Sequence, residues 1–421
     1  MKKNDILKCL KANKNIDDFE VSIVDKDSRE LFYVLDHLEI NRAVKVNTTS
    51  ILVYAGNKKE RGSSIVTVTA ADDNKSLSKK LQEAVKKAKA AKNNFYPLAD
   101  KKENIIEKAP KEKELNDIAS LVAKAVLKAD VYEEGWINST EIFVSSFAKE
   151  FINSKGVNHK TYSFDVQIEV VPTWSNGKEE IELYKFIESN KADYAKITKE
   201  VNEILNLAKE RSNAKKLSEV KVPSGIKVLV KNDMRDKLIG NLCSDLSYRE
   251  LFLHQNHYHV KDVISNNKFD LTMKPVIEGC ARSSRYDSNG IVLKPKKIVS
   301  GGVIKDNFGD IQYGTYLGVK DITGKLPICE LKGEAYDYTK EKHIIVETFS
   351  SPQLEELSGY WGGEVRLARY FDGKKYIPLT SFSISGSIYE DYKNIKFSKE
   401  QDISSSYKGP KYLIFDNIKL H

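Results

Sequence analysis

The sequence Arg282–Gly314, RSSRYDSNGIVLKPKKIVSGGVIKDNFGDIQYG, contains the turns that decide how the second half of the chain folds. Asp287-Ser288-Asn289-Gly290 is typical of a tight turn. Ser300-Gly301-Gly302 predicts a second turn, between two strands that run from Lys294 to Ile304. Glycine suits both turns because it adopts positive φ angles without steric cost. The stretch therefore predicts a turn followed by a β-hairpin.

A charged and aromatic segment precedes this hairpin and contains Arg282, Arg285, Tyr286 and Asp287. Loops between rigid strands often carry binding groups, so Arg282, Arg285 and Asp287 are candidate binding residues. The alternative is an ordinary surface turn with solvated charges. The local sequence leaves both interpretations open.

The composition indicates a globular protein without a concentrated basic surface. The chain has 421 residues, enough for two or three domains, and 40% of them are hydrophobic. Lys and Arg exceed Asp and Glu by 68 − 60 = 8, but the basic residues alternate with acidic ones along the chain. A nucleic-acid partner is therefore not expected.

The cysteines and the N-terminal sequence predict a cytoplasmic protein. Cys9, Cys243, Cys280 and Cys329 lie far apart and form no CxxC pair, and the sequence MKKNDILKCLKANK is too polar for a secretory signal. No apolar run approaches the roughly 20 residues that cross a bilayer. We therefore expect no membrane insertion.

The first part of the chain predicts small antiparallel sheets covered by helices. Apolar positions recur at helical spacing from Leu77 to Ala91 and from Leu115 to Val126, and again from Tyr194 to Ala208. The charged segment Asn93–Glu114 contains two prolines and marks a possible boundary near residues 97–113. The expected strands are Glu20–Val24, Glu30–Leu35, Ala43–Val46, Ile51–Tyr54, Ile65–Ala70, Glu141–Ser146, Glu150–Asn153 and Tyr162–Val171.

Beyond Arg211 the helical periodicity gives way to strands punctuated by glycine. The clearest is a late hairpin, Glu364–Phe371 and Tyr376–Ser385, in which Phe382 and Ile384 alternate with serines. The predicted fold is α+β, with an N-terminal α/β part at residues 1–220. A β-rich, antiparallel C-terminal domain is expected at residues 221–421.

Three separated signatures occur in one order: Ala148–Gly156, the turn Tyr286–Ile291 with its hairpin, and Asp372–Gly386. In this order the chain resembles the TldD/PmbA family of zinc-dependent peptidases and peptide-maturation proteins, also described as modulators of DNA gyrase. The family has two kinds of subunit. TldD-type subunits carry HExxxH on a helix near the start of the C-terminal domain, where two histidines hold zinc and the glutamate activates water. PmbA-type subunits, also called TldE, lack that motif.

The corresponding segment here, Met234–Leu242, contains no histidine, and the last cysteine of the chain is Cys329. The resemblance therefore implies a PmbA-like subunit without a zinc site, so no catalytic residue and no cofactor are expected. It also implies a role in peptide maturation or proteolysis, a peptidase-like C-terminal domain at residues 221–421, and a peptide-binding cleft that Arg282, Arg285 and Asp287 are expected to border. The expected partners are a TldD-type metallopeptidase subunit or a second copy of the chain, together with a peptide substrate that could add as a strand to a sheet edge.

A histidine cluster supports the alternative of an independent metallopeptidase, or of a hydrolase with an unrecognised site. His254, His257 and His259 lie within six residues, and closely spaced imidazoles can bind a transition metal. Only Asp262 is near enough in sequence to assist them. The competing interpretation is a loop whose histidines pack on aromatic rings or form hydrogen bonds. No GxSxG, P-loop or strand-to-helix GxGxxG motif is present.

Overall fold

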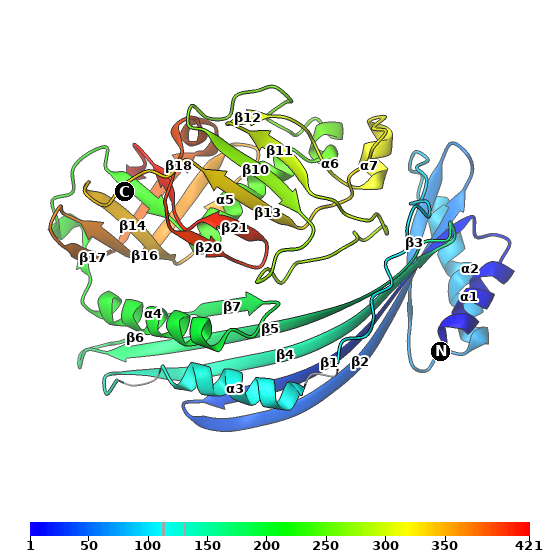
Figure 1. Cartoon of the computed structure of the whole chain (residues 1–421), viewed down its shortest axis with the longest axis horizontal. Coiled ribbons are helices and arrows are strands. Elements are labelled where there is room, and N and C mark those ends of the chain that lie inside the picture. The colour runs from blue at the N-terminus through cyan, green and yellow to red at the C-terminus, as the bar shows by residue number, and fades with distance from the viewer. Residues whose placement is uncertain (112–113, 130–131) are drawn as a thin grey trace.

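A computed structural model describes residues 1–111, 114–129 and 132–421. A long, curved sheet from the first half of the chain lies beneath a β-rich C-terminal part (Figure 1). The predicted α+β class is confirmed. The elements of the first half are α1 Lys3–Ala12, β1 Asp18–Val34, β2 His37–Gly56, β3 Arg61–Val68, α2 Asn74–Ala90, α3 Leu115–Leu127, β4 Gly135–Asn153, β5 Asn158–Ser175, β6 Glu180–Glu182, β7 Lys185–Ser189 and α4 Tyr194–Ser212.

The expected small sheets are in fact one sheet of long strands. Its order is β3-β2-β1-β4-β5-β6, with β7 also on β5. β1 unites the predicted segments Glu20–Val24 and Glu30–Leu35, because its polar central residues continue to pair with β2 and β4. β4 and β5 form a hairpin across Asn153–Gly156, where Gly156 has φ +90°.

Helices cover the sheet at its two ends. α2 buries the predicted apolar stripe, including Leu77, Leu81 and Ala88, against β2 and β3, and its first turn is capped by the side chain of Asp73. α3 and α4 cover the other end (Figure 1). Residues 93–111 of the predicted linker form no helix or strand. Isolated bridges join Asn94 to Glu60 and Ile106 to Lys160, and Leu98 is buried. Residues 112–113 of that linker lie outside the described residues.

The C-terminal part consists of two further sheets with α5 in the core between them. One sheet has the order β12-β11-β10-β13-β21-β20, and the other contains β19-β22-β9-β14-β16-β17-β8. Its elements are β8 Lys215–Lys216, β9 Lys227–Val230, α5 Asn232–Asp245, α6 Tyr248–Phe252, β10 Phe269–Lys274, β11 Lys296–Ser300, β12 Val303–Ile304, α7 Ile311–Tyr316, β13 Ile328–Gly333, β14 His343–Phe349, β15 Gln353–Leu354, β16 Tyr360–Phe371, β17 Tyr376–Thr380, β18 Phe382–Ser387, α8 Ile388–Asp391, β19 Lys396–Phe397, β20 Gln401–Ile403, β21 Tyr407–Pro410, β22 Leu413–Phe415 and β23 Lys419–Leu420.

Both predicted hairpins of this part are confirmed. Gly301 and Gly302 have φ +61° and +78° between β11 and β12. The late hairpin turns at Asp372, whose carboxylate accepts hydrogen bonds from the backbone N–H groups of Lys374 and Lys375. Both Phe382 and Ile384 are buried. Ser381, with φ +58°, divides the returning strand into β17 and β18.

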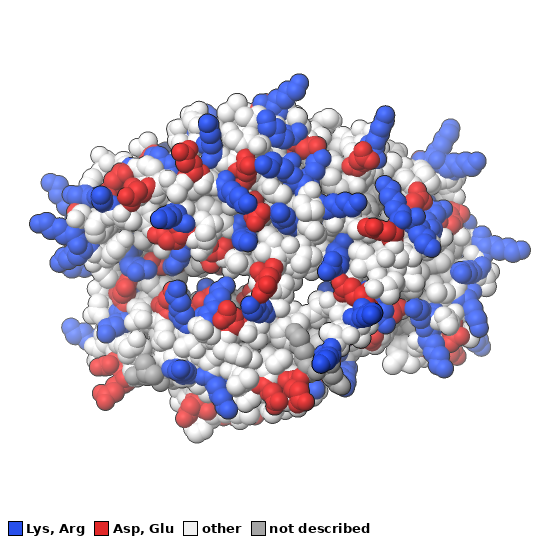
Figure 2. All heavy atoms as spheres, in the orientation of Figure 1, with Lys and Arg blue, Asp and Glu red and all other residues white. Residues whose placement is uncertain are grey.

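The surface carries mixed charge. Basic and acidic side chains are interspersed over the face in Figure 2, without a broad area of one sign. Among the described residues, no helix combines the length and the apolar character needed to cross a membrane.

Candidate peptide-handling site

α5 is the helix at the position where the resemblance places a zinc motif in TldD-type subunits. It follows the buried strand β9 and turns Met234, Leu238 and Leu242 into the core. Arg235 is also fully buried, and its guanidinium lies 2.8 Å from both Asp236 and Asp402 and 4.2 Å from the Tyr407 ring centroid. Burial opposes the charge, but the two carboxylates outweigh it and raise the pKa of Arg235.

This arrangement does not fit zinc. α5 contains no histidine, and a buried guanidinium would repel a divalent cation. Within residues 1–111, 114–129 and 132–421, no three His, Cys, Asp or Glu side chains are grouped so that they could hold a metal ion. The ion cluster around Arg235 instead joins α5 to β20.

A surface groove of about 630 Å³ runs along the outer face of α5. Lys237, Gly240 and Asn241 form one wall, and residues 352–356 form the other. The Lys237 ammonium donates a hydrogen bond of 2.9 Å to the carbonyl of Pro352. The groove therefore combines a cation, an amide and backbone groups, which suits an extended polar chain.

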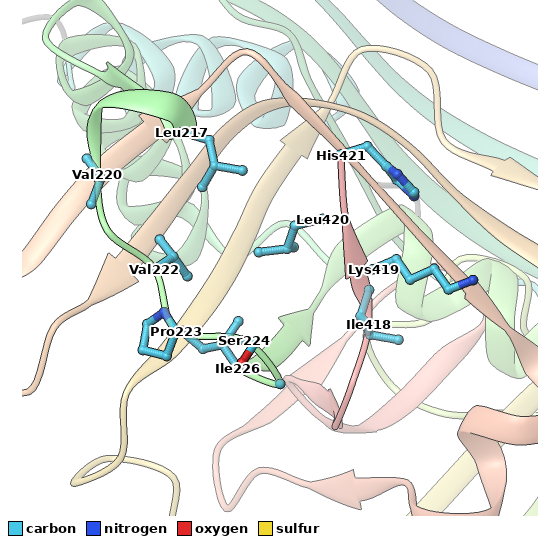
Figure 3. A pocket seen from close by; sticks show the side chains of 11 residues that line it. Leu217, Val220, Val222, Pro223, Ser224, Ile226, Ile418, Lys419, Leu420 and His421 are labelled. Carbon is cyan, nitrogen blue, oxygen red and sulfur yellow. The ribbon is translucent and has the colours of Figure 1, made fainter.

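A second hollow, of about 570 Å³, lies between residues 217–226 and the last strand of the chain. Leu217, Val222 and Leu420 converge in it, whereas Lys419 and His421 point away (Figure 3). The His421 ring forms a 2.7 Å hydrogen bond with the Ser385 hydroxyl. This hollow is mainly apolar and offers no group of reactive side chains.

The predicted site residues Arg282, Arg285 and Asp287 have different environments. The Asp287 carboxylate is buried and accepts hydrogen bonds from the backbone N–H groups of Asn289, Ile291 and Lys325. Burial raises the pKa of Asp287. Arg282 and Arg285 are exposed, and the Arg285 guanidinium lies 2.6 Å from Glu107 of the first half. Asp287 thus holds the turn, and the two arginines remain accessible.

The turn at Asp287–Gly290 docks on the long sheet. His159 of β5 forms a 2.9 Å hydrogen bond with the carbonyl of Gly290, and its ring lies 4.6 Å from that of Tyr286. Gly290 has φ +80°, and a Cβ there would lie 2.2 Å from the Phe151 ring. Only glycine fits this contact. The signature turn is consequently part of the junction between the two halves.

A buried polar cluster beside this junction was missed by sequence reasoning. Glu20 of β1 is 4% exposed and accepts a 3.0 Å hydrogen bond from the Tyr54 hydroxyl. Arg61, also buried, pairs with Asp18 at 2.7 Å. Burial is the largest influence on Glu20 and, assisted by Asp287, raises its pKa from 4.5 to about 7 against the hydrogen bonds from Tyr54 and Asn289. Nothing in the local strand pattern distinguishes these charges from exposed ones.

A second missed cluster connects α4 to the C-terminal sheet. The side chain of Glu347 in β14 is fully buried and forms ion pairs with Lys231 and Arg369. Arg369 also lies 3.6 Å from Glu210 of α4. Burial opposes ionisation of Glu347, but the two cations outweigh it and lower its pKa. No sequence signal identifies this set, because its members come from β14, β16, α4 and the residue between β9 and α5.

The three histidines lie in an exposed loop after α6. The ring of His257 stacks on Tyr389 at 3.7 Å. The backbone N–H groups of His257 and Tyr258 donate to Asp245, and that of His259 donates to Asp262. The contacts match the packing interpretation of this loop.

Comparisons with known proteins match the C-terminal part by sequence and the whole chain by fold. Residues 225–421 match the sequence model of the PmbA/TldA metallopeptidase C-terminal domain. No curated protein matches the chain by sequence. The fold resembles TldE from Thermococcus kodakarensis, with 15% identity, TM-score 0.82 and 99% of each chain covered.

Two further solved structures share the whole fold. Both are described as candidate modulators of DNA gyrase. The one from Thermotoga maritima has 13% identity and a TM-score of 0.80 over 100% of this chain and 99% of its own. The one from Bacteroides thetaiotaomicron has 17% identity and a TM-score of 0.79 over 99% and 98%. Residues 225–421 therefore belong by sequence to the PmbA/TldA metallopeptidase C-terminal domain family, and the whole chain shares the fold of these solved structures.

Proposed function

We propose that this chain is a non-catalytic, TldE-like subunit that acts with a TldD-type metallopeptidase partner in peptide maturation or proteolysis. The observation that carries the proposal is α5, whose buried Arg235 is paired with Asp236 and Asp402 in place of metal ligands. The likeness to TldE over 99% of the chain supports a retained scaffold. A chain that keeps this fold but has no residues to hold the metal is most simply a subunit that binds the catalytic partner.

In this role the groove beside α5 and the exposed Arg282 and Arg285 bind segments of a peptide. Guanidinium groups form strong paired hydrogen bonds with carboxylates, so the two arginines favour acidic side chains or a free C-terminus. Backbone groups in the groove favour an extended main chain. Asp287 contributes by holding the loop that presents the arginines.

Co-expression with a TldD-type subunit that carries HExxxH tests the proposal. We expect one complex in size-exclusion chromatography, because a stable interface of more than about 1,000 Å² survives dilution. Peptide cleavage should require both subunits and should stop on chelation or when the partner's HExxxH histidines are replaced. Chelator-sensitive cleavage by this chain alone would exclude the non-catalytic role.

The metal content of the purified chain separates this proposal from an independent metallopeptidase. We expect no stoichiometric zinc by elemental analysis, because α5 presents Arg235 and Lys237 where ligands would be needed. One zinc per chain that disappears in the His257→Ala, His259→Ala variant would instead assign the metal to the histidine loop.

A further inference from the structure

Lysines are concentrated on the two helices that cover one end of the long sheet. Residues 1–14 and 72–92 contain 12 lysines and four acids, which are Asp5, Asp72, Asp73 and Glu83. The rest of the chain has 68 − 12 = 56 basic and 60 − 4 = 56 acidic side chains, so these two segments carry the whole net charge of +8. Charge that is balanced elsewhere in the chain is therefore gathered at one end of the molecule.

The two helices lie on the same face of the sheet. Ile6 and Leu10 of α1 share a core with Leu77 and Leu81 of α2 and with residues of β1, β2 and β3. In Figure 1 both helices lie on the side of the sheet that faces away from the C-terminal part. Figure 2 shows this end of the molecule from the side, where basic side chains project from its margin.

The lysines of both helices point away from the sheet. At about 100° per residue, Lys75, Lys79 and Lys86 lie within about 40° of one another, on the side of α2 opposite its buried residues. On α1, Lys8 and Lys11 are exposed, whereas the apolar stripe of the helix is buried. The solvent sides of the two neighbouring helices therefore form one basic surface.

Few of these charges are neutralised within the chain. Lys3 pairs with Glu150, and Lys80 pairs with Asp72. The other 12 − 2 = 10 lysines of residues 1–14 and 72–92 are exposed, and none has an ion pair among the described residues. These ten side chains are called the lysine face below. Their charge is available to an anionic partner.

The composition of the two segments narrows the choice of partner. They contain no aromatic residue on which single-stranded bases could stack, and no arginine to form paired hydrogen bonds with base edges. Apart from Met1, their large apolar side chains pack against the sheet, so none is free to enter a bilayer. The lysine face therefore suits a surface of phosphate charge that is contacted without insertion.

A nucleic-acid duplex and an anionic lipid leaflet both present such a surface, and their shapes differ. The outer side of two packed helices is convex. A duplex is convex as well, so the two would touch along one line and few lysines would reach a phosphate. A leaflet is nearly flat and fluid, so anionic headgroups can gather beneath the lysines of both helices.

We propose that the lysine face binds the surface of a membrane leaflet rich in anionic phospholipid. Clusters of about four to eight basic residues on an amphipathic helix attract such a surface, and each lysine close to it strengthens binding roughly fivefold. The attachment is electrostatic and superficial. The groove beside α5 belongs to the C-terminal part, so it stays open to peptides while the chain is attached.

Co-sedimentation of the purified full-length chain with lipid vesicles tests the proposal. The vesicles contain phosphatidylglycerol and phosphatidylcholine in equal parts, or phosphatidylcholine alone. At about 0.1 M salt, where charges act over about 10 Å, we expect binding to the anionic vesicles only. At about 1 M salt, where this distance falls to about 3 Å, binding should be lost.

Charge variants locate the contact. The triple variant Lys75→Gln, Lys79→Gln, Lys86→Gln removes three charges from the lysine face and should weaken binding to the anionic vesicles by roughly 10- to 100-fold. Glu83→Lys adds a charge at an exposed position of α2 and should strengthen binding by about fivefold. A gain of this kind cannot come from misfolding.

The triple variant Lys332→Gln, Lys374→Gln, Lys375→Gln is the matched control, because it removes the same charge from exposed positions of the C-terminal part. It should bind the anionic vesicles as the wild type does. The proposal is overturned if the wild type binds neither kind of vesicle or both equally. An equal loss in the two triple variants, or no gain in Glu83→Lys, would also overturn it.

Competition with duplex DNA at the same phosphate concentration separates the two polyanions. We expect the anionic vesicles to retain the chain. If the DNA displaces it, and the loss of the three α2 lysines weakens DNA binding instead, the lysine face belongs to nucleic acid and the lipid assignment is wrong. Neither result affects the proposed pairing with a TldD-type subunit.

Discussion

The buried carboxyl of Glu20 makes stability depend on pH. In the unfolded chain this group ionises near its ordinary pKa of 4.5, whereas the folded protein retains the proton up to a pKa of about 7. The folded state therefore binds more protons between pH 4.5 and 7, and stability falls as the pH rises through that window. The loss amounts to roughly 3 kcal/mol above pH 7.

Glu20→Gln removes this dependence, because the amide stays neutral and can still accept the hydrogen bond from Tyr54. We expect the melting temperature of the variant to approach that of the wild type at pH 5 and to exceed it at pH 8. Thermal unfolding of both proteins at several pH values measures the difference. Glu83→Gln, at an exposed position, serves as the control and should show no such trend. An equal effect of Glu20→Gln at pH 5 and pH 8 would rule out a protonated Glu20.

At the residue scale, local alternation of apolar and polar residues predicted which side chains are buried. Contacts between residues far apart in the sequence could not be predicted in this way. The burial of Phe382 and Ile384 follows from their spacing between serines, which the sequence displays directly. The partners of Arg235 include Asp402, 167 residues away, so its burial depends on packing that no local pattern records. For the same reason Asp287 could be assigned to a turn, but its role in binding the loop at Lys325 could not be predicted.

Among the elements, helices and turns were predicted better than the extent of strands. α2 and the hairpins carry strong local signals, namely an apolar stripe and glycine turns. β1 was divided in two because its central residues, Asp25–Asp27, are charged. In a strand that pairs on both sides, backbone hydrogen bonds hold such residues extended, and the side chains reach solvent at the sheet face.

The signature turn that docks on the sheet gives a prediction at this scale. Gly290→Ala combines a left-handed backbone, worth about 1–2 kcal/mol, with a clash against Phe151 worth about 1–3 kcal/mol more. Gly301→Ala has the same backbone strain, with φ +61°, but its Cβ meets open space. Chemical denaturation should therefore show a larger loss for Gly290→Ala. Equal losses would mean that the turn yields without disturbing the junction.

For the whole molecule, the described residues join the halves at several places, among them the signature turn, α4 and Asn190, whose side chain bonds Gly279 and Cys280. The predicted domain boundary between residues 220 and 221 stays a prediction. The two parts share extensive contacts. Leu367 of β16 is fully buried in the core formed by α3, α4 and the long sheet, while its neighbour Ala368 faces the core of the C-terminal part. One strand therefore contributes to both cores, and the wild type should unfold in a single calorimetric transition.

Leu367→Ala tests that coupling. The cavity should cost about 2–5 kcal/mol. Because the lost contacts are those between the halves, the single transition should broaden or separate into two. Leu357→Ala, at a side chain 80% exposed, is the matched control and should change neither the midpoint nor the shape of the transition. If Leu367→Ala lowers the midpoint of a transition that remains single and sharp, the halves are coupled mainly through the turn at Gly290, and Gly290→Ala should then be the variant that separates them.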